Sequence, residues 1–567
     1  MEDRNILIEV ENLKYRYPHT EELALKGVSF RVRQGEFIGV VGANKAGKST
    51  LTQALMGLVP QFYKGAYGGR VLVDGKEADK TPIDEICKSV GLVFQNPFNQ
   101  LSGAKDSVYE EIAFGLQNMG IAPEEMRRRI DAAMTLLDIA QYRDKNPFDL
   151  SGGQMQRVAI ASILVMEPKI FVLDEPTSQL DPAGTEEVFK AVLRLAKAGK
   201  TIIMVEQKPE KLAAYCDRIL LMADGQVVDF DTPERIFSRN DLEQIGVQPP
   251  VYTRLARAQG WCVAREGDVC IYPVRQEEMA PFREPLAALV RELTGAAAPR
   301  RDEKAAGRTV FEVKGVTFSY DKGAEGRRAI DGLSLSLDGR ATAIVGQNGA
   351  GKTTLVKLLK GLLKPVGGSI LYDGADISGR TVASLAGAVG YVFQSPDDQI
   401  FKSRVLDEVM FGPLNIGMDK AAAREKSLAA LRTVGLEDAA GKNPYDLELA
   451  ERKLVAVASV LSMDTRVIIF DEPTIAQDYC GRETMKRIIR ELTAQGKLVI
   501  AILHDMDFVA DCFARVVVMA HGRILADGTP EEVFAQERIL EEARIERPHA
   551  AAMCSALGLE GFVRLAV

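Results

Sequence analysis

Two stretches of the chain combine glycine, lysine and a hydroxyl residue at the spacing of a phosphate-binding loop. Gly42 to Ser49 and Gly346 to Thr353 both read G-x-x-x-x-G-K-[S/T], each after an apolar run and before a helical pattern. Backbone N–H groups at such a helix start surround phosphate oxygens, the lysine reaches the β- and γ-phosphates, and the hydroxyl ligates Mg²⁺. The sequence therefore predicts two sites for a nucleoside triphosphate with Mg²⁺, lined by Gly42, Asn44, Gly47, Lys48, Ser49 and Thr50 in the first and by Gly346, Asn348, Gly349, Gly351, Lys352, Thr353 and Thr354 in the second.

Two apolar strand patterns, "IFVLDEP" and "VIIFDEP", each end in a pair of carboxylates. The first of each pair, Asp174 or Asp471, is predicted to hold Mg²⁺ directly or through water. The second, Glu175 or Glu472, is predicted to act as the general base that polarises an attacking water. An acidic strand end alone is a weak signal, but beside a glycine loop it is a strong one.

Amide and aromatic side chains complete the predicted sites. Gln95 and Gln394 follow "LVF" and "YVF" and could ligate Mg²⁺ or the attacking water. Tyr17 and Tyr320 precede the glycine loops and could stack on adenine, although packing in the core is an equal alternative for each.

The motifs recur because the chain is an internal duplication. "VGANKAGKSTL" returns as "VGQNGAGKTTL", and "VGLVFQNPFNQL" returns as "VGYVFQSPDDQI". Short β-branched runs alternate with longer helical patterns, which predicts an α/β fold with a mainly parallel sheet in each copy. We expect domains at 1–265 and 308–567, joined by a flexible linker over 266–307 that is rich in small and charged residues.

Composition limits the class of protein. The net charge of −8 gives no basic footprint for a nucleic-acid partner, and no apolar run is long enough for a membrane span. The start, "MEDRNILIEV", lacks the pattern of a signal peptide. The seven cysteines form no CxxC pair, so scattered reduced thiols are expected rather than a metal site or a disulfide framework. These features together predict a cytosolic protein.

Both copies resemble the nucleotide-binding domain of ABC ATPases in their glycine loop, Gln loop, Asp-Glu strand and the signature "LSGGQ" at 150–154. The resemblance implies two P-loop domains that each carry a helical signature subdomain and pair head to tail, with each ATP held between one glycine loop and the opposite signature. Ser151, Gly152, Gly153 and Gln154 would then face the ATP of the second loop, and residues 447–451 the ATP of the first. His504 stands where the family places its γ-phosphate-contacting histidine.

The two sites are predicted to be unequal. The second copy's signature reads Glu448-Leu449-Ala450-Glu451, and Gln207 replaces the histidine at that same first-loop site. One like charge near the γ-phosphate costs about 3 kcal/mol at ~5 Å and an effective dielectric of about 20. We therefore expect the first-loop site to bind ATP but to hydrolyse it slowly or not at all, although the retained Glu175 argues for some activity.

The segments after the Gln loops are similar to the ATPases of energy-coupling factor (ECF) vitamin transporters. They read "FQNPFNQLSGAKDSVYEEIAFGLQNMGI" and "FQSPDDQIFKSRVLDEVMFGPLNIGM", and in that family they grip helices of a membrane T-component. The first copy departs from the family pattern at Gly103-Ala104 and Leu116. The resemblance implies a peripheral ATPase on the cytoplasmic face of the membrane, working with a T-component and a substrate-binding S-component to import a vitamin or similar micronutrient.

Three alternatives remain open at this level. The chain could drive another importer class, such as a sugar importer. It could instead be a soluble ribosome-associated ABC-F factor, or serve DNA repair or chromosome structure. The last two classes favour a basic surface or long charged insertions, which this chain lacks.

Overall fold

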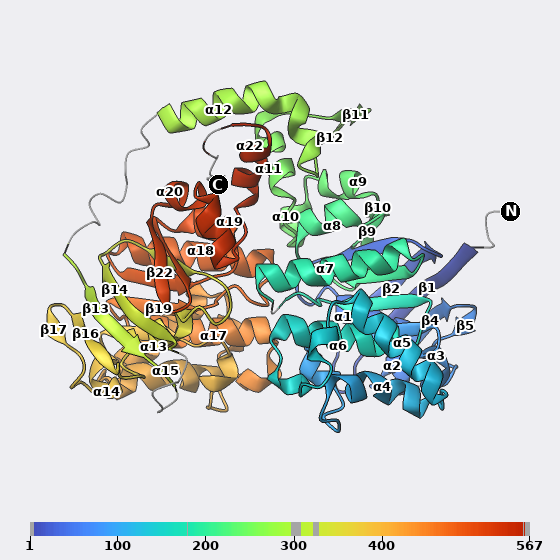
Figure 1. The fold of residues 1–567 in the computed structure, drawn as a ribbon, viewed down its shortest axis with the longest axis horizontal. Helices are drawn as coiled ribbons and strands as arrows, with labels where there is room; N and C mark the ends of the chain where they lie inside the picture. The colour runs from blue at the N-terminus through green and yellow to red at the C-terminus, as the bar shows by residue number, and fades with distance from the viewer. Residues whose placement is uncertain (1–4, 179, 296–307, 321–327, 560, 562–567) are drawn as a thin grey trace. The chain divides into compact units, whose positions relative to one another are not determined.

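The computed structural model describes residues 5–178, 180–295, 308–320, 328–559 and 561. Contacts divide the chain into two compact units, Met1–Pro281 and Phe282–Val567. In Figure 1, unit 1 runs from blue to green and unit 2 from green to red. No helix among the described residues is long and apolar enough to cross a membrane.

Unit 1 is built on a six-stranded sheet in the order β10-β9-β3-β8-β7-β6. All neighbouring strands in it are parallel except β10, which pairs antiparallel with β9. A second, antiparallel sheet has the order β2-β1-β4-β5. The strands are β1 (Ile6–Arg16), β2 (Leu25–Arg33), β3 (Phe37–Val41), β4 (Ala66–Val73), β5 (Lys76–Glu77), β6 (Val90–Val93), β7 (Ile170–Asp174), β8 (Thr201–Val205), β9 (Arg218–Ala223) and β10 (Gln226–Asp231).

Helices cover these sheets in the alternating order that the sequence predicts. They are α1 (Lys48–Leu55), α2 (Leu58–Gln61), α3 (Ile83–Ile86), α4 (Val108–Asn118), α5 (Pro123–Leu136), α6 (Gly152–Leu164), α7 (Pro182–Lys197), α8 (Pro209–Tyr215), α9 (Pro233–Phe237), α10 (Leu242–Ile245) and α11 (Val251–Gln259). The predicted α/β class with a mainly parallel sheet is confirmed.

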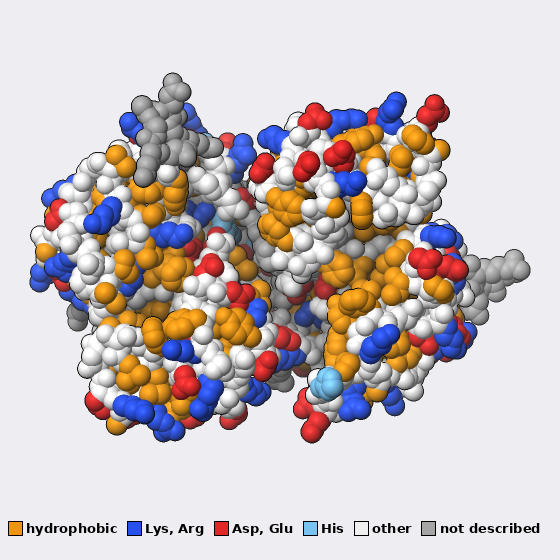
Figure 2. Space-filling view, turned by 90° about the horizontal axis from the view of Figure 1, so that it is seen from below, with side chains coloured by type: hydrophobic (Ala, Val, Ile, Leu, Met, Phe, Trp, Pro, Cys, Tyr) orange, Lys and Arg blue, Asp and Glu red, His pale blue; other side chains and the backbone are white. Residues whose placement is uncertain are grey.

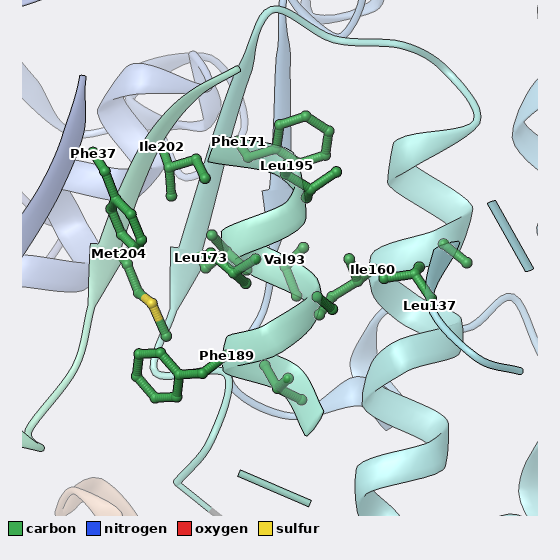
Figure 3. Close-up of a cluster of buried hydrophobic side chains, with 14 of the residues drawn as sticks. Phe37, Val93, Leu137, Ile160, Phe171, Leu173, Phe189, Leu195, Ile202 and Met204 are labelled. Carbon is green, nitrogen blue, oxygen red and sulfur yellow. The ribbon is translucent and has the colours of Figure 1, made fainter. Parts of the chain in front are cut away.

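The parallel strands are buried on both faces, which explains their continuous apolar sequence. Phe171 and Leu173 of β7 belong to one hydrophobic cluster, whereas Ile170 and Val172, which alternate with them along the strand, belong to another. Figure 3 shows the first cluster, where Phe171 and Leu173 lie against the helix that carries Leu195. This two-sided burial fixes β7, and with it the carboxylates that follow.

Unit 2 repeats the same plan. Its six-stranded sheet has the order β18-β19-β20-β15-β21-β22, in which each strand has its counterpart in unit 1, and its antiparallel sheet has the order β14-β13-β16-β17. The strands are β13 (Phe311–Phe318), β14 (Ile330–Leu337), β15 (Thr342–Val345), β16 (Gly367–Tyr372), β17 (Ala375–Asp376), β18 (Val389–Val392), β19 (Val467–Asp471), β20 (Leu498–Ile502), β21 (Arg515–Ala520) and β22 (Arg523–Gly528). The helices are α12 (Arg283–Gly295), α13 (Lys352–Leu359), α14 (Val382–Leu385), α15 (Val405–Asn415), α16 (Lys420–Thr433), α17 (Leu449–Leu461), α18 (Tyr479–Ala494), α19 (Met506–Cys512), α20 (Pro530–Phe534), α21 (Glu537–Ala543) and α22 (His549–Ala556).

Part of the segment predicted to be a linker carries secondary structure. A hairpin of β11 (Ala264–Glu266) and β12 (Val269–Ile271) precedes α12, so the interval 266–295 is not a plain connector. Residues 296–307, which include the remainder of the predicted linker, lie outside the described residues.

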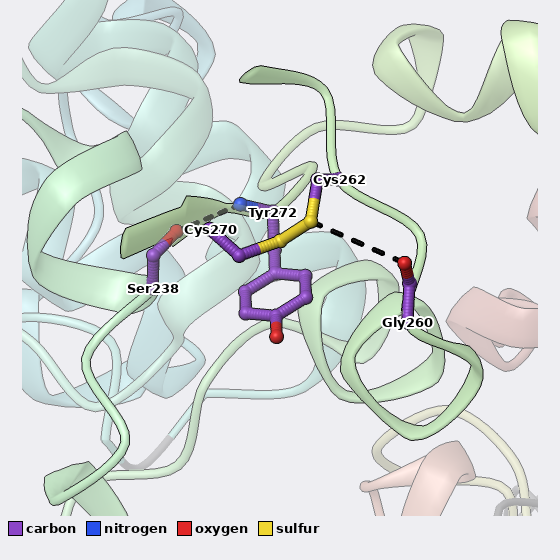
Figure 4. The surroundings of a disulfide bond; sticks show 5 residues. All are labelled: Ser238, Gly260, Cys262, Cys270 and Tyr272. Carbon is purple, nitrogen blue, oxygen red and sulfur yellow. Dashed lines mark hydrogen bonds between the residues drawn. A yellow bond between two sulfur atoms is a disulfide. The ribbon is translucent and has the colours of Figure 1, made fainter. Parts of the chain in front are cut away.

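The expectation that all seven cysteines are reduced thiols is wrong for one pair. Cys262 and Cys270 form a disulfide that closes the β11–β12 hairpin, with Cα atoms 5.6 Å apart (Figure 4). The strand register brings the two residues together, and spacing alone does not reveal it. The other five cysteines, all among the described residues, take part in no disulfide.

Candidate functional site

The glycine loop of unit 1 joins β3 to α1 and cannot accept a side chain at its first position. A Cβ at Gly42 would lie 2.3 Å from the carbonyl oxygen of Met222. Gly47 caps α1 in the left-handed conformation, with φ of 92°. The buried Lys48 donates from Nζ to the carbonyl oxygens of Gly42 at 2.9 Å and Ala43 at 2.8 Å, so its ammonium lies over the loop.

The loop between β15 and α13 in unit 2 has the same construction. A Cβ at Gly346 would lie 2.1 Å from the carbonyl oxygen of Met519. Lys352 Nζ donates to the carbonyl oxygens of Gly346 at 2.7 Å and Gln347 at 3.0 Å. Both loops therefore present backbone N–H groups, a helix N-terminus and a lysine in the arrangement that binds phosphate.

The carboxylates predicted to hold Mg²⁺ end equivalent strands, β7 and β19. Asp174 Oδ1 is buried and has no hydrogen-bond partner among the described residues, and burial raises the pKa of this carboxyl group. In unit 2, the Thr353 hydroxyl lies 3.5 Å from Asp471 Oδ1. Mg²⁺ takes carboxylate and hydroxyl oxygens of this kind, so the residues present fit the ion.

Both predicted base glutamates directly follow these strands in a strained backbone conformation. Glu175 and Glu472 have φ of 45° and 52°, in the left-handed region that side chains rarely adopt. Their N–H groups donate to Val205 and Ile502, the last residues of β8 and β20. Strain of this kind persists where the surrounding structure fixes a residue, which is typical of functional sites.

In unit 1, neutral amides and a second carboxylate surround the base. Gln207 Nε2 donates to Glu175 Oε1 at 2.9 Å, and Gln95 Nε2 donates to Oε2 at 3.0 Å. Burial raises the pKa of Glu175 to about 7, Lys48 opposes the rise, and the buried Glu206 adds to it. About half of the Glu175 side chains would therefore be protonated at neutral pH, and unable to accept a proton from water.

In unit 2, a histidine, an amide and two lysines surround the equivalent group. His504 Nε2 lies 2.8 Å from Glu472 Oε1, and Gln394 Nε2 donates to Oε2 at 2.7 Å. Burial raises the pKa of Glu472, but His504, Lys352 and Lys453 outweigh burial, so the pKa lies below its ordinary value. This carboxylate is ionised at neutral pH, which is the state that a general base requires.

Three residues around these carboxylates were missed by the sequence interpretation. Glu206 accepts from the Gln207 N–H at 2.8 Å in unit 1. In unit 2, Lys453 Nζ donates to the Glu472 carbonyl at 3.0 Å, and Tyr391 Oη donates to Asp471 Oδ2 at 2.7 Å. For Glu206 and Lys453 the available signal was a charged residue at the edge of an apolar run, as in "TIIMVE" and "RKLVAV".

The signature segment of unit 1 forms the start of α6. Ser151 is the N-cap, and the Gln154 N–H lies 3.4 Å from its Oγ. The Ser151 N–H donates back to Gln154 Oε1 at 3.1 Å, which completes a capping box. A Cβ at Gly153 would lie 3.1 Å from the Cα of Gly184, so α6 and α7 approach closely here.

The altered signature of unit 2 keeps this helix start while changing its charge. Glu448 is the N-cap of α17, and its N–H donates to Glu451 Oε2 at 3.2 Å. The segment 448–451 therefore still folds as a helix N-terminus, but it carries two carboxylates where unit 1 has a hydroxyl and an amide.

The two candidate adenine-stacking tyrosines contact the helices that follow the glycine loops. Tyr17 Oη lies 3.1 Å from Thr50 Oγ1, and Tyr320 Oη lies 3.1 Å from Thr354 Oγ1. Tyr17 is half-buried, whereas Tyr320 is 61% exposed. Core packing therefore does not account for Tyr320, and stacking on a base stays a prediction for both residues.

The segments after the Gln loops place aromatic rings at the surface. In unit 2, the rings of Phe401 and Phe411 meet edge to face at 4.7 Å, and Lys402 Nζ lies 4.9 Å from the Phe411 ring. Tyr445 Oη donates to the carbonyl of Ile400 at 2.7 Å. Phe401, Phe411 and Tyr445, here named the unit 2 aromatic patch, are all exposed.

Unit 1 has a corresponding surface. Phe98 and Phe148 stack at 6.0 Å and are exposed, as is Phe114 of α4. The apolar residues Val108 and Ile112 of the same helix are buried instead and pack within unit 1. Figure 2 shows hydrophobic side chains gathered among charged ones at the surface.

A phosphate loop, a carboxylate suited to Mg²⁺ and a strand-end glutamate on a parallel sheet define a nucleoside-triphosphatase fold, present twice in this chain. The chain belongs to the ABC transporter family, whose profile matches residues 25–178 and 330–475. It is an ATP-binding cassette ATPase of an ABC transporter, with two such domains in tandem.

Relatives match along nearly the whole chain. A Methanosarcina acetivorans protein named "Putative ABC transporter ATP-binding protein" is 36% identical, over 96% of this chain and 89% of that one. A Caldanaerobacter subterraneus protein of the same description is 35% identical, over 98% of this chain and 97% of that one. Among solved structures, cbiO1 from Clostridium perfringens, part of the ABC transporter complex cbiONQ, is 32% identical over 44% of this chain and all of that one, with a TM-score of 0.38.

Proposed function

We propose that this chain is the ATP-hydrolysing subunit of an ECF-type importer. It would couple ATP binding and hydrolysis to uptake of a vitamin or similar micronutrient through separate membrane subunits. In this proposal residues 1–265 and 308–567 are the nucleotide-binding domains, and the chain is peripheral to the cytoplasmic face of the membrane. One composite site, made of the second glycine loop and the signature at 150–154, performs the hydrolysis.

The proposal of unequal sites is supported by the contrast in pKa between the two predicted base glutamates, Glu175 and Glu472. Each lies at the same place in its own unit. Burial and Glu206 raise the pKa of Glu175 to about 7, whereas the hydrogen bond with His504 and the nearby Lys352 and Lys453 hold the pKa of Glu472 below its ordinary value. This contrast is independent of the altered signature at 448–451. Two separate features therefore disfavour hydrolysis at the first glycine loop.

The experiment compares Glu472→Gln with Glu175→Gln in the full chain. Removing the base from the competent site should lower ATP turnover by about 100-fold or more, which corresponds to about 3 kcal/mol in the barrier. The matched Glu175→Gln variant should retain at least half of the turnover. Equal losses in the two variants would contradict the assignment of one competent site.

The unit 2 aromatic patch supports the proposal of a membrane partner. Phe401 and Phe411 expose apolar surface in the segment after the Gln loop, where a partner helix would sense the nucleotide site, and the exposed Tyr445 joins them through its bond to the Ile400 carbonyl. Exposed clusters of this type mark interaction surfaces, and aromatic residues dominate interface energetics. The T-component that the sequence resemblance implies fits this surface.

Affinity purification from detergent-solubilised membranes tests the partner. The full chain should recover small apolar polytopic proteins, and Phe401→Ala with Phe411→Ala should lose them. Val366→Ala is the matched control because Val366 is also exposed but lies outside the aromatic patch, in the loop before β16. Co-sedimentation with ribosomes instead would favour the ABC-F alternative, and recovery of a two-protein permease with a periplasmic-type binding protein would favour a sugar importer.

A further inference from the structure

A buried tyrosine–carboxylate hydrogen bond in unit 2 has no tyrosine counterpart in unit 1, where the equivalent Asp174 has the hydroxyls of Ser49 and Thr52 as partners. Tyr391 Oη donates to Asp471 Oδ2 at 2.7 Å, and both side chains are buried. The equivalent residue in unit 1 is Leu92 of β6, which is buried and has no donor. The equivalent carboxylate, Asp174, has an oxygen without a hydrogen-bond partner among the described residues.

Strand register explains how the tyrosine reaches this carboxylate. β18 and β19 are parallel neighbours, and Tyr391 pairs with Ile469, two residues before Asp471. Side chains two residues apart share a face and lie about 7 Å apart along the strand, which is close to the length of a tyrosine ring with its hydroxyl. The ring of Phe393 meets Tyr391 edge to face at 4.6 Å and helps to hold it in this direction.

Because of this bond, the two carboxylate oxygens of Asp471 have different partners. Oδ2 of Asp471 is occupied by the Tyr391 hydroxyl, whereas Oδ1 lies 3.5 Å from the hydroxyl of Thr353. Thr353 is, with Gln394, one of the other residues predicted to bind Mg²⁺ in unit 2. A hydrogen bond to one oxygen of a metal-binding carboxylate orients the other, and loss of such an outer partner typically costs about 10- to 100-fold in metal affinity.

We propose that Tyr391 is a positioning residue that orients Asp471 toward Mg²⁺ at the second-loop site. Leu92 cannot supply this bond at the first-loop site, where the hydroxyls of Ser49 and Thr52 act on Asp174 instead. The two sites would therefore hold their metal-binding carboxylates through different partners. The inference rests on the proposed role of Asp471 in the competent site. It concerns metal binding, which is measurable without turnover.

The test is Tyr391→Phe in the full chain, which removes the hydroxyl and keeps the ring. Binding of Mn²⁺ in the presence of a non-hydrolysable ATP analogue, followed by electron paramagnetic resonance, should show one of two metal classes weakened by about 10-fold. The Mg²⁺ concentration for half-maximal ATP turnover should rise by a similar factor, while kcat at saturating Mg²⁺ falls less than about 2-fold.

Tyr372→Phe is the matched control because Tyr372 is another buried tyrosine of the same core in unit 2. It should leave both metal classes unchanged. Unchanged metal binding in Tyr391→Phe, or an equal loss in Tyr372→Phe, would overturn the inference. If Glu472→Gln retains full turnover, the proposed function fails whatever the metal titration shows, so the two failures are distinguishable.

Discussion

Glu175 and Glu472 end equivalent strands, but the residues around them differ in charge. Position by position, Gln207 corresponds to His504, and the neighbouring Glu206 corresponds to Leu503. The second difference makes the surroundings of Glu472 less negative, and the first places an imidazole Nε2 at 2.8 Å from Glu472 Oε1. Interaction of a charge pair at ~8 Å and an effective dielectric of about 20 is about 2 kcal/mol, which is more than one pKa unit. A few substitutions therefore suffice to separate the two sites.

Lys453 offers a direct test at this scale because unit 1 has Gln156 at the equivalent position. Lys453→Gln removes a buried lysine that favours ionised Glu472, so the pKa of Glu472 should rise. Because a base acts only when ionised, the acidic limb of the kcat–pH profile should move upward by the same amount. Steady-state turnover between pH 5.5 and 9 measures this shift. Arg432→Gln, an exposed substitution on α16, is the control and should leave the profile unchanged.

Lys360 offers a prediction about stability. It follows α13, donates to the carbonyl of Val389, and burial lowers its pKa to about 8. The unfolded chain therefore binds more protons than the folded one between about pH 8 and 10.5, so stability rises with pH in that window, and the full penalty applies below it. Lys360→Met, which copies Met56 of unit 1, should stabilise unit 2 by about 2 kcal/mol at pH 7 after loss of the hydrogen bond.

Thermal unfolding of the full chain measures this effect. The transition of unit 2 should rise by about 4–8 °C at pH 7 in Lys360→Met, since a change of 1 kcal/mol shifts Tm by about 2–4 °C for a unit of this size. At pH 10 the difference should shrink because the lysine is then largely neutral in the folded state. A Tm gain that is equal at both pH values would contradict the explanation by burial of charge.

The residues that the sequence predicted are those whose position follows from one local motif. The glycine loops and the strand-end pairs at 174–175 and 471–472 could be placed because strand, turn and helix are contiguous in the chain. Tyr391 and Lys453 could not, because each reaches the site from a separate segment through strand register or helix packing. The disulfide between Cys262 and Cys270 was missed for the same reason.

At the scale of elements, the β11–β12 hairpin depends on its cross-link more than the central sheet depends on any single bond. The two strands make only three register pairs, and most of their residues are exposed. Anchors to the rest of unit 1 are few among the described residues: the Tyr272 N–H donates to Ser238 Oγ at 2.9 Å, and Arg235 pairs with Glu266 at 3.0 Å. A hairpin with so little buried area has low local stability.

Cys262→Ser with Cys270→Ser should therefore increase hydrogen exchange of the hairpin amides and leave the central sheet unchanged. Closing a loop of eight residues contributes about 2–3 kcal/mol by chain entropy, and all of it acts on this hairpin. ATP turnover should stay within about 2-fold of the parent. Cys480→Ser, an exposed free thiol on α18, is the control and should change neither exchange nor turnover. Slower turnover in the double variant would show that the hairpin communicates with the site.

At the scale of the whole molecule, duplication explains why two sites can diverge. The strand orders of the two units correspond one to one, so both copies retain the fold while their site residues differ. The capping interaction at Glu448 shows the same separation, because it preserves the start of α17 while placing charge there. Folding and catalysis impose separate demands on the same segment. If the signature at 150–154 and Glu472 serve one site, as proposed, fusion of the two units supplies both in every molecule.

The proposed head-to-tail pairing predicts which site the altered signature affects. Restoring Ser-Gly-Gly-Gln at 448–451 removes a like charge near the opposite γ-phosphate, a penalty of about 3 kcal/mol or ~100-fold in rate. In a Glu472→Gln background, where the second-loop site is silent, the restored chain should hydrolyse ATP at least about 10-fold faster than its parent. Gln207 and Glu206 will keep that rate below the native one.

Adding Lys48→Ala to the restored chain identifies the glycine loop that gained activity. If residues 448–451 face the ATP held at Lys48, this substitution should abolish the gain, whereas the equivalent Lys352→Ala should leave it in place. The reverse pattern would mean that each signature serves the glycine loop of its own unit. Measuring phosphate release from these three chains at saturating Mg²⁺ and ATP therefore decides the pairing, because only a head-to-tail arrangement makes a change in unit 2 depend on a lysine in unit 1.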